Sequence, residues 1–154
     1  MKEDMPQILP RCQLVPEPGH RVRFLVDGEE RVAWLFGEDH PRPCFYPVIG
    51  PAGLPLTRMG HPGAPDHDHH QSVWFAHEKV GGVNFWGNQG QATIRQSTWL
   101  CYEDGDDRAA MAVRLHWRDD QARELMAQDL VAILRPLPNK EFLLELQSLL
   151  PPAE

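Results

Sequence analysis

One stretch of the chain, AAMAVRLHWR at residues 109–118, alternates with a period of two over its whole length. Successive side chains of a β-strand point to opposite faces of the sheet. The pattern therefore predicts a strand of an antiparallel sheet, with one face buried and the other in solvent. The residues expected on the buried face are Ala109, Met111, Val113, Leu115 and Trp117.

Turn signals divide the rest of the chain at intervals of ~8–12 residues, a spacing typical of β-sandwiches and barrels. Asp27-Gly28 is a typical hairpin turn. Residues 122–137 also fit a helical pattern, but the turns on either side favour a long strand with a bulge. Strands are predicted at 7–15, 21–26, 31–36, 44–49, 54–57, 71–77, 93–102, 109–118, 122–137 and 141–149.

These segments predict an all-β fold, an antiparallel β-sandwich that forms a single domain over residues 1–154. The formal net charge is −7 and no basic stripe is present, which argues against a nucleic-acid partner. No segment approaches the ~20 apolar residues of a membrane-spanning helix. The three cysteines are sparse and widely spaced, which is typical of a reducing compartment. We expect a soluble, cytoplasmic protein with a small-molecule partner and no membrane partner.

Most of the reactive side chains lie in residues 61–86, HPGAPDHDHHQSVWFAHEKVGGVNFW, which contain five of the eight histidines. The carboxylates of Asp66, Asp68 and Glu78 lie among them. Histidine and carboxylate side chains bind divalent metals and transfer protons near neutral pH. A site loop is therefore predicted at residues 58–86, where glycine and proline make the chain irregular.

The first hypothesis for this loop is a metal site. In an extended conformation, residues 66–70 place His67 and His69 on the same face. These two histidines, with Asp66 beside them, are the predicted ligands of a divalent metal: zinc, iron or manganese. The alternative is a polar surface loop whose histidines hydrogen-bond one another and the backbone.

A metal-free hypothesis uses the same segment for proton transfer. A histidine paired with a carboxylate can move a proton to or from a sugar hydroxyl, or a carbon next to a carbonyl. His67, His69, His70 or His77 could act with Glu78 or Asp66, and the spacing does not select the pair. His70, His77 and Glu78 are the predicted acid–base residues. His77-Glu78 resembles the start of the HExxH zinc motif, but Gly81 stands at the position of the second histidine, which excludes that motif.

Aromatic residues follow the histidines and suit the stacking of a sugar ring. Trp74, Phe85 and Trp86 are the predicted ring platform, and burial in the core is the alternative for each of them. Asn84, Asn88 and Gln91 carry amides that suit hydroxyl recognition.

The loop and its surroundings resemble the bacterial methane oxygenase PmoA-like family. The resemblance implies a β-sandwich similar to part of a galactose-mutarotase-like supersandwich, and a role in carbohydrate metabolism. The most specific segments are DHDHH at 66–70 and SVWFAH at 72–77, supported by PCFYPV at 43–48, GPAG at 50–53, LTR at 56–58 and GVNFW at 82–86.

Two features depart from that family. Its members carry arginine directly after the double histidine, where this chain has Gln71, so Gln71 is a predicted substrate contact that binds more weakly than an arginine clamp. Family members are also longer, so the chain is expected to be a half-domain that dimerises, a fragment of a larger sheet, or an inactive relative. Residues 141–150 form an apolar strand near the end of the sequence, which predicts a homo-oligomer through this strand.

The functional expectation has three forms. The leading hypothesis is an enzyme that transfers protons on a sugar-like substrate, with or without a metal. The second is a non-catalytic sugar-binding or interaction module. The third is a metal-dependent oxygenase, as the family name implies, with two histidines and one carboxylate on iron. Loss of a histidine would abolish turnover in the first case, and loss of Trp74 or Trp86 would abolish binding in the second.

Overall fold

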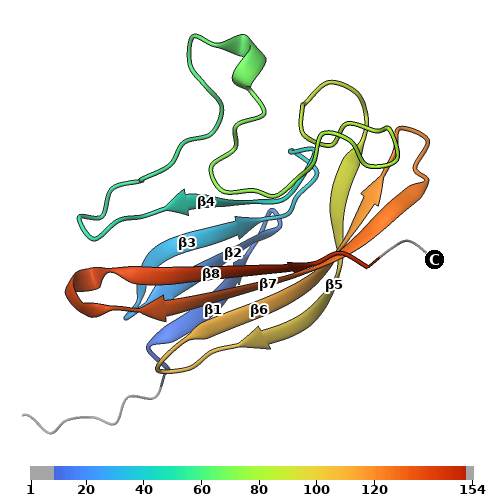
Figure 1. The fold of residues 1–154 in the computed structure, drawn as a ribbon. Helices are drawn as coiled ribbons and strands as arrows, with labels where there is room; N and C mark the ends of the chain where they lie inside the picture. Colours follow the sequence, from blue (N-terminus) through green and yellow to red (C-terminus); the bar gives the residue numbers. More distant parts are fainter. Residues whose placement is uncertain (1–8, 152–154) are drawn as a thin grey trace, which may run out of the picture.

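A computed structural model describes residues 9–151. They form two antiparallel sheets of four strands, each with its strands in sequence order (Figure 1). The expected all-β antiparallel sandwich is therefore confirmed. The first sheet contains β1 (Cys12–Glu17), β2 (Arg21–Val26), β3 (Glu29–Leu35) and β4 (Cys44–Val48); the second contains β5 (Thr93–Glu103), β6 (Ala109–Arg118), β7 (Glu124–Pro136) and β8 (Phe142–Leu149).

The hairpin between β2 and β3 follows from its two turn residues. Asp27 and Gly28 have φ angles of 50° and 79°, and a type I′ turn requires positive φ at both positions. The strands then pair directly across the turn, from Val26 opposite Glu29. This part of the prediction is confirmed.

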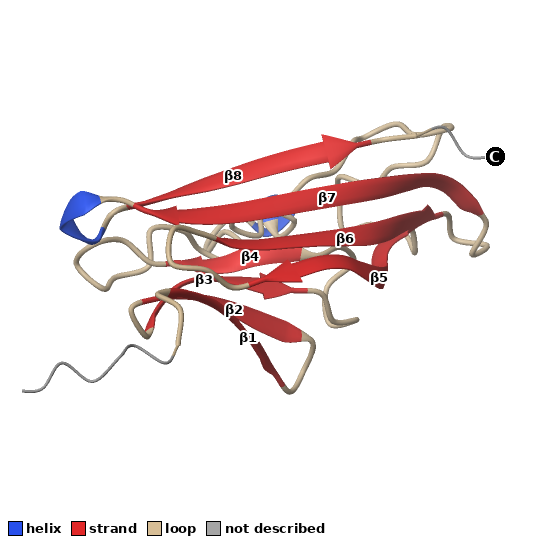
Figure 2. Ribbon diagram, turned by 90° about the horizontal axis from the view of Figure 1, so that it is seen from below, coloured by secondary structure: helices blue, strands red, loops and turns tan. Residues whose placement is uncertain are grey.

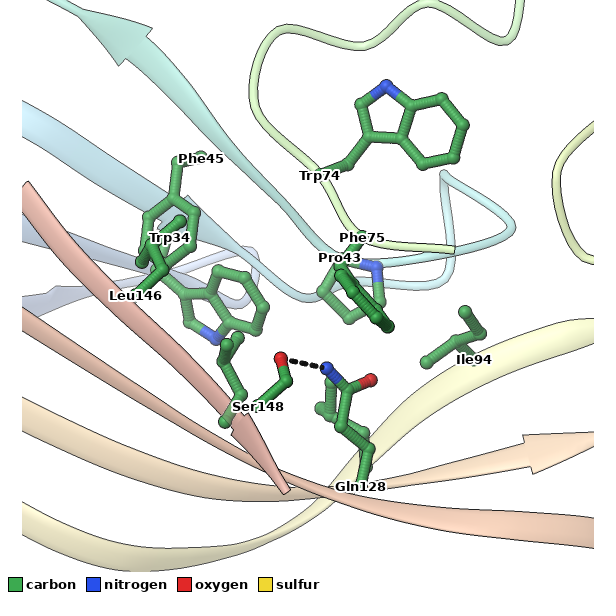
Figure 3. Close-up of a pocket in the computed structure, with 11 residues that line it drawn as sticks. Trp34, Pro43, Phe45, Trp74, Phe75, Ile94, Gln128, Leu146 and Ser148 are labelled. Carbon is green, nitrogen blue, oxygen red and sulfur yellow. Dashed lines mark hydrogen bonds between the residues drawn. The ribbon is translucent and has the colours of Figure 1, made fainter. Parts of the chain in front are cut away.

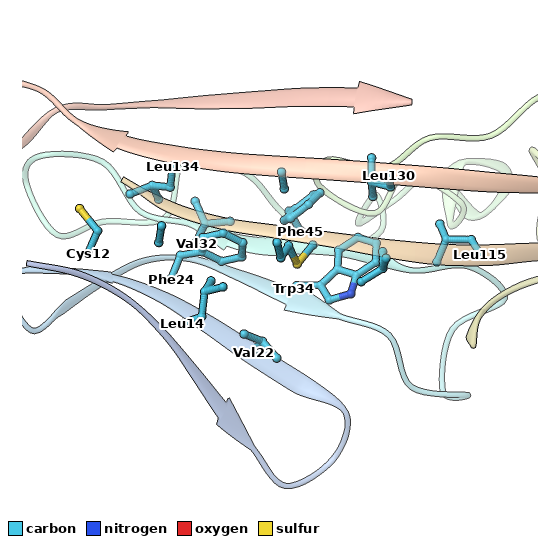
Figure 4. Packing of buried hydrophobic residues seen from close by; sticks show 14 of the residues in the cluster. Cys12, Leu14, Val22, Phe24, Val32, Trp34, Phe45, Leu115, Leu130 and Leu134 are labelled. Atoms are coloured by element: carbon cyan, nitrogen blue, oxygen red, sulfur yellow. The ribbon is translucent and has the colours of Figure 1, made fainter. Parts of the chain in front are cut away.

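The alternation in β6 builds the core between the sheets. Met111, Val113, Leu115 and Trp117 are buried, whereas Arg114 is exposed. The four buried residues of β6 belong to one apolar cluster with side chains of the first sheet. Figure 4 shows Phe24, Val32 and Trp34 facing Leu115, Leu130 and Leu134.

Residues 122–137 form a strand and not a helix. β7 pairs with β6 on one side and with β8 on the other, so its backbone hydrogen bonds are supplied by two neighbours. The register shifts between Trp117 and Arg118, which is the expected irregularity of this hairpin. Within residues 9–151 the helical segments are two short 3₁₀ turns, η1 (Pro65–His67) and η2 (Pro138–Lys140). No helix in this part of the chain is long and apolar enough to cross a membrane.

Three predicted strands need correction. The first strand begins at Cys12, and the part of its prediction before Leu9 lies outside the described residues. Residues 54–57 and 71–77 make isolated bridges and no strand: Ile49 to Pro55 in the first segment, and Phe45 to Val73 and Met59 to Gln71 in the second. Ser72, with φ of 59°, interrupts the extended conformation that a longer pairing with β4 would need.

β8 is the outer strand of its sheet, as Figure 2 shows. Phe142 and Leu144 pack against the core, whereas Leu143, Leu146 and Leu149 are exposed. A long edge strand with exposed apolar side chains is a template for pairing with another chain.

We therefore expect the chain to self-associate through β8, so that its molar mass in light scattering rises with concentration. Leu149→Lys should shift the protein toward single chains, because a charge on an edge strand opposes pairing. Leu54→Lys is the matched control, since Leu54 and Leu149 are 67% and 66% exposed but only Leu149 lies on β8. A single-chain mass at all concentrations would contradict the expectation.

Candidate functional site

The segment between β4 and β5, residues 49–92, carries the predicted site loop (green in Figure 1). It is fastened to the edge of β4 by hydrogen bonds in both directions between Phe45 and Val73, with N···O distances of 2.8 and 3.4 Å. The amide of Gly60 donates to the carbonyl of His70 at 2.7 Å, which closes the histidine turn at its base. The loop is thus an ordered extension of the first sheet.

Arg42 organises this loop from beneath. Its side chain is 1% exposed, and its guanidinium stacks on the ring of Trp74 with Cζ 4.3 Å from the ring centroid. Burial lowers the pKa of Arg42 to about 10, so the group remains charged at neutral pH. It donates to the carbonyls of His69 (3.2 Å), Phe85 (3.2 Å) and Gly87 (3.4 Å), and to Oδ1 of Asn88 (2.8 Å).

Arg42 is not among the residues predicted from the sequence. A single arginine between Pro41 and Pro43 matches no catalytic or binding motif. The available signal was a charged residue directly before the apolar strand of residues 44–48, a place where a charge needs a buried partner.

The histidine segment is turned and not extended, which corrects the geometry assumed for the metal site. Residues 65–67 form η1, with Pro65 at its first position, and the amide of His70 donates to the carbonyl of His67 at 3.1 Å. In such a turn, side chains three residues apart lie above one another. The rings of His67 and His70 accordingly meet with centroids 4.9 Å apart, and the His69 ring lies 4.5 Å from that of His70.

The charges within the cluster are coupled. The carboxylate of Asp66 lies 2.9 Å from Nδ1 of His67, which is shielded from solvent and makes no well-aligned hydrogen bond. The contact with His67 holds the pKa of Asp66 below its usual range. Burial, and then the neighbouring imidazole of His69, lower the pKa of His70.

The predicted metal ligands lie close together. The rings of His67 and His69 stack with centroids 6.0 Å apart, and the carboxylate of Asp66 faces Nδ1 of His67. Within residues 9–151 no three His, Cys, Asp or Glu side chains are grouped so that they could hold one ion. The assignment of His67, His69 and Asp66 to a metal therefore stays a prediction.

The shifted groups predict a pH response of the loop. The pKa of His70 lies below its usual 6.5, so protonation of His70 favours an open loop. The contribution of His70 to the stability of the closed loop is therefore fully present above pH 6.5 and declines as the pH falls below 6.5. The lowered pKa of Asp66 acts in the same direction, but only below its usual 3.8. We expect the tryptophan fluorescence of the loop to change between about pH 7 and pH 5. His70→Gln should flatten that change, and identical profiles for both proteins would contradict this account.

Two tryptophans form the aromatic part of the site. The rings of Trp74 and Trp86 have centroids 4.5 Å apart, and His69 lies 6.4 and 6.2 Å from them. Trp86 is 43% exposed and thus keeps a free surface. Phe85 does not belong to the platform: it is buried, 5.0 Å from the ring of Trp117.

Gln71 is also buried, which corrects its predicted contact with a substrate. Its Nε2 lies 3.3 Å from Nδ1 of His40, and its Oε1 has no hydrogen-bond partner in the described part of the chain. The bridge between Met59 and Gln71 fixes the backbone there. The residue therefore lies within the base of the loop.

A polar pocket of about 350 Å³ lies beside Trp86. Asn84 and Asn88 use their side-chain oxygens within the loop: Asn84 accepts from the amides of Trp86 (2.8 Å) and Gly87 (3.1 Å), and Asn88 from Arg42. Their NH₂ groups are left to donate to a ligand. The pocket is lined by Asp66, Asp68, His69, Glu78, Asn84, Trp86, Gly87, Asn88 and Gln89; Gln91 does not line it.

The three predicted acid–base residues lie at different distances from the pocket. Glu78 lines the pocket. His70 does not line it, and its ring contacts that of His69, which does. His77 is exposed and its Nδ1 accepts a hydrogen bond from the amide of Lys79 at 3.0 Å, so it closes its own turn. Among the histidines it is His69, predicted as a metal ligand, that reaches the pocket.

Comparison with known proteins places the chain in a family. Neither curated proteins nor solved structures gave a match, so the likeness to the galactose-mutarotase-like supersandwich stays a prediction. The family model that matches residues 21–154 is described as a family of unknown function, DUF6807, and nothing in it refers to a methane oxygenase. The resemblance to the PmoA-like family is therefore wrong, and the oxygenase hypothesis loses its basis. The chain belongs to the DUF6807 family.

Proposed function

We propose that the pocket beside Trp86 binds a sugar-like small molecule. The observation that carries the proposal is the free surface of Trp86 next to a pocket lined by three carboxylates and three amide groups. Sugar rings present C–H faces that pack on aromatic rings, and hydroxyls that pair with carboxylates and amides. Because Asp66, Asp68 and Glu78 are acidic, the ligand is neutral or cationic.

We further propose that His69 and Glu78 transfer protons on the bound sugar. Geometry supports them, because both side chains line the pocket. In the interconversion of sugar anomers, a base removes the proton of the anomeric hydroxyl while an acid protonates the ring oxygen. The bond between the ring oxygen and the anomeric carbon breaks, and the C–O bond of the former anomeric hydroxyl becomes the C=O bond of an open-chain aldehyde. Ring closure on the opposite face reverses both proton transfers, so the reaction needs no oxidant.

The second candidate is a non-catalytic sugar-binding module. The same tryptophan and amide groups support it, since they account for recognition without any proton transfer. The two candidates differ in the effect of removing the imidazole of His69, which would eliminate turnover in an enzyme and leave binding intact in a module.

Binding is tested by ligand-observed NMR with a panel of neutral monosaccharides and the full chain. Trp86→Ala should weaken binding about ten-fold or more, as expected for a central aromatic contact. The control is Trp99→Ala, because Trp99 is similarly exposed but lies on β5, packed against Phe36 and Tyr102. Equal effects of the two substitutions, or no sugar binding at all, would refute the proposal.

We also propose a cytoplasmic location. All three cysteines are free thiols, and Cys12 and Cys44 are buried. Unpaired cysteines are typical of proteins kept in a reducing compartment.

A further inference from the structure

A second pocket lies between the two sheets. It has a volume of about 220 Å³ and is lined by side chains of both sheets and by Trp74 and Phe75 of the loop (Figure 3). Trp34 and Phe45 of the first sheet and Leu130 of the second line it. Leu146 of β8 also lines the pocket and is 42% exposed.

Two polar side chains interrupt the apolar lining. Gln128 is 1% exposed; its Oε1 accepts from Nε1 of Trp117 at 3.0 Å, and its Nε2 donates to Oγ of Ser148 at 2.9 Å (Figure 3). These two bonds use one hydrogen of Nε2 and leave the hydroxyl hydrogen of Ser148, an exposed residue, in the described residues free to donate. Gln128 and Ser148 can therefore both donate to an acceptor on a ligand.

The lining also limits the charge and size of a ligand. It contains no charged side chain, so an ionised ligand would lose its hydration without gaining a partner. An apolar cavity of about 150 Å³ is large enough for benzene. The space here therefore suits a ring with a small substituent.

We propose that this intersheet pocket binds a small neutral molecule, an apolar ring or short chain with one hydrogen-bond acceptor directed at Ser148 and Gln128. A ketone or ether oxygen satisfies this requirement. The two pockets share no lining residue, and Trp74, which contacts Trp86 of the sugar site, lies between them.

The test compares acetophenone with ethylbenzene, which has nearly the same shape but no acceptor, by calorimetric titration of the full chain. Acetophenone should bind about five-fold more tightly, the ratio expected for one neutral hydrogen bond. Ser148→Ala should remove most of this difference and leave the affinity for ethylbenzene unchanged. Benzoate, which has a similar shape and a charge, should not bind.

The variant Leu146→Trp tests whether the ligand binds in the pocket. Leu146 lines the pocket, so the larger side chain should occupy part of it and abolish binding of both compounds. Leu143→Trp is the matched control: Leu143 is exposed on the opposite face of β8. The proposal is overturned if neither compound binds, if both bind equally to the unmodified chain, or if binding survives Leu146→Trp.

Discussion

Replacing Arg42 with methionine is expected to lower the free energy of unfolding by about 3 kcal/mol. Methionine fills much of the same space, so the loss arises from the hydrogen bonds and the stacking on Trp74 and not from a cavity. Four acceptors would lose their donor: the carbonyls of His69, Phe85 and Gly87, and Oδ1 of Asn88. Each buried acceptor left without a partner costs roughly 1–3 kcal/mol, and water entering the loop offsets part of the sum.

Urea denaturation measures this change, and amide hydrogen exchange locates it. The amides of Gly60 and His70, which tie the histidine turn, should exchange faster in Arg42→Met. Arg114→Met is the control, because Arg114 pairs with Asp129 on the exposed face of β6 and such pairs contribute about 1 kcal/mol or less. Equal stabilities of the two variants would show that the loop does not depend on Arg42.

Arg42 shows which part of the site could not be predicted from the sequence. Strand positions in β6 could be predicted because a period of two has one structural solution, and the hairpin at Asp27-Gly28 because few residues adopt positive φ at both positions. Arg42 contacts residues 27 to 46 positions away along the chain. Such contacts have no local pattern, so they become visible only once the fold is known.

The histidine segment shows a second kind of limit. Its density of imidazoles and carboxylates predicts a site within residues 61–86, but the roles of individual residues depend on the local backbone. A strand would place His67 beside His69 alone, whereas the 3₁₀ turn also brings His67 against His70, with ring centroids 6.0 and 4.9 Å away. Pro65 was the local signal for a turn, because proline is favoured at the first position of a helical turn. Phe85 and Trp86 show the same dependence: they are adjacent, yet the first is in the core and the second in solvent.

If the sugar site is catalytic, His69→Gln is expected to lower kcat by about 100-fold or more while the KM changes little. General acid–base catalysis contributes roughly 10²–10⁴-fold, and glutamine keeps a polar side chain of similar length without a proton-transfer group. The carbonyl of His69 still accepts from Arg42 in the variant, so the loop should keep its shape. Trp86→Ala should have the opposite signature, with weaker binding of the sugar and a smaller effect on kcat.

The assay follows anomer interconversion by NMR for whichever monosaccharide binds. His77→Gln is the decisive control, because the sequence favours His77 as the acid–base residue whereas the structure places it in its own exposed turn with Lys79. Full turnover in His77→Gln together with loss in His69→Gln would support the pocket geometry, and the reverse result would favour the sequence prediction. Sugar binding without turnover in the unmodified chain would leave the binding module as the function of this loop, since recognition by Trp86 and the amides needs no proton transfer.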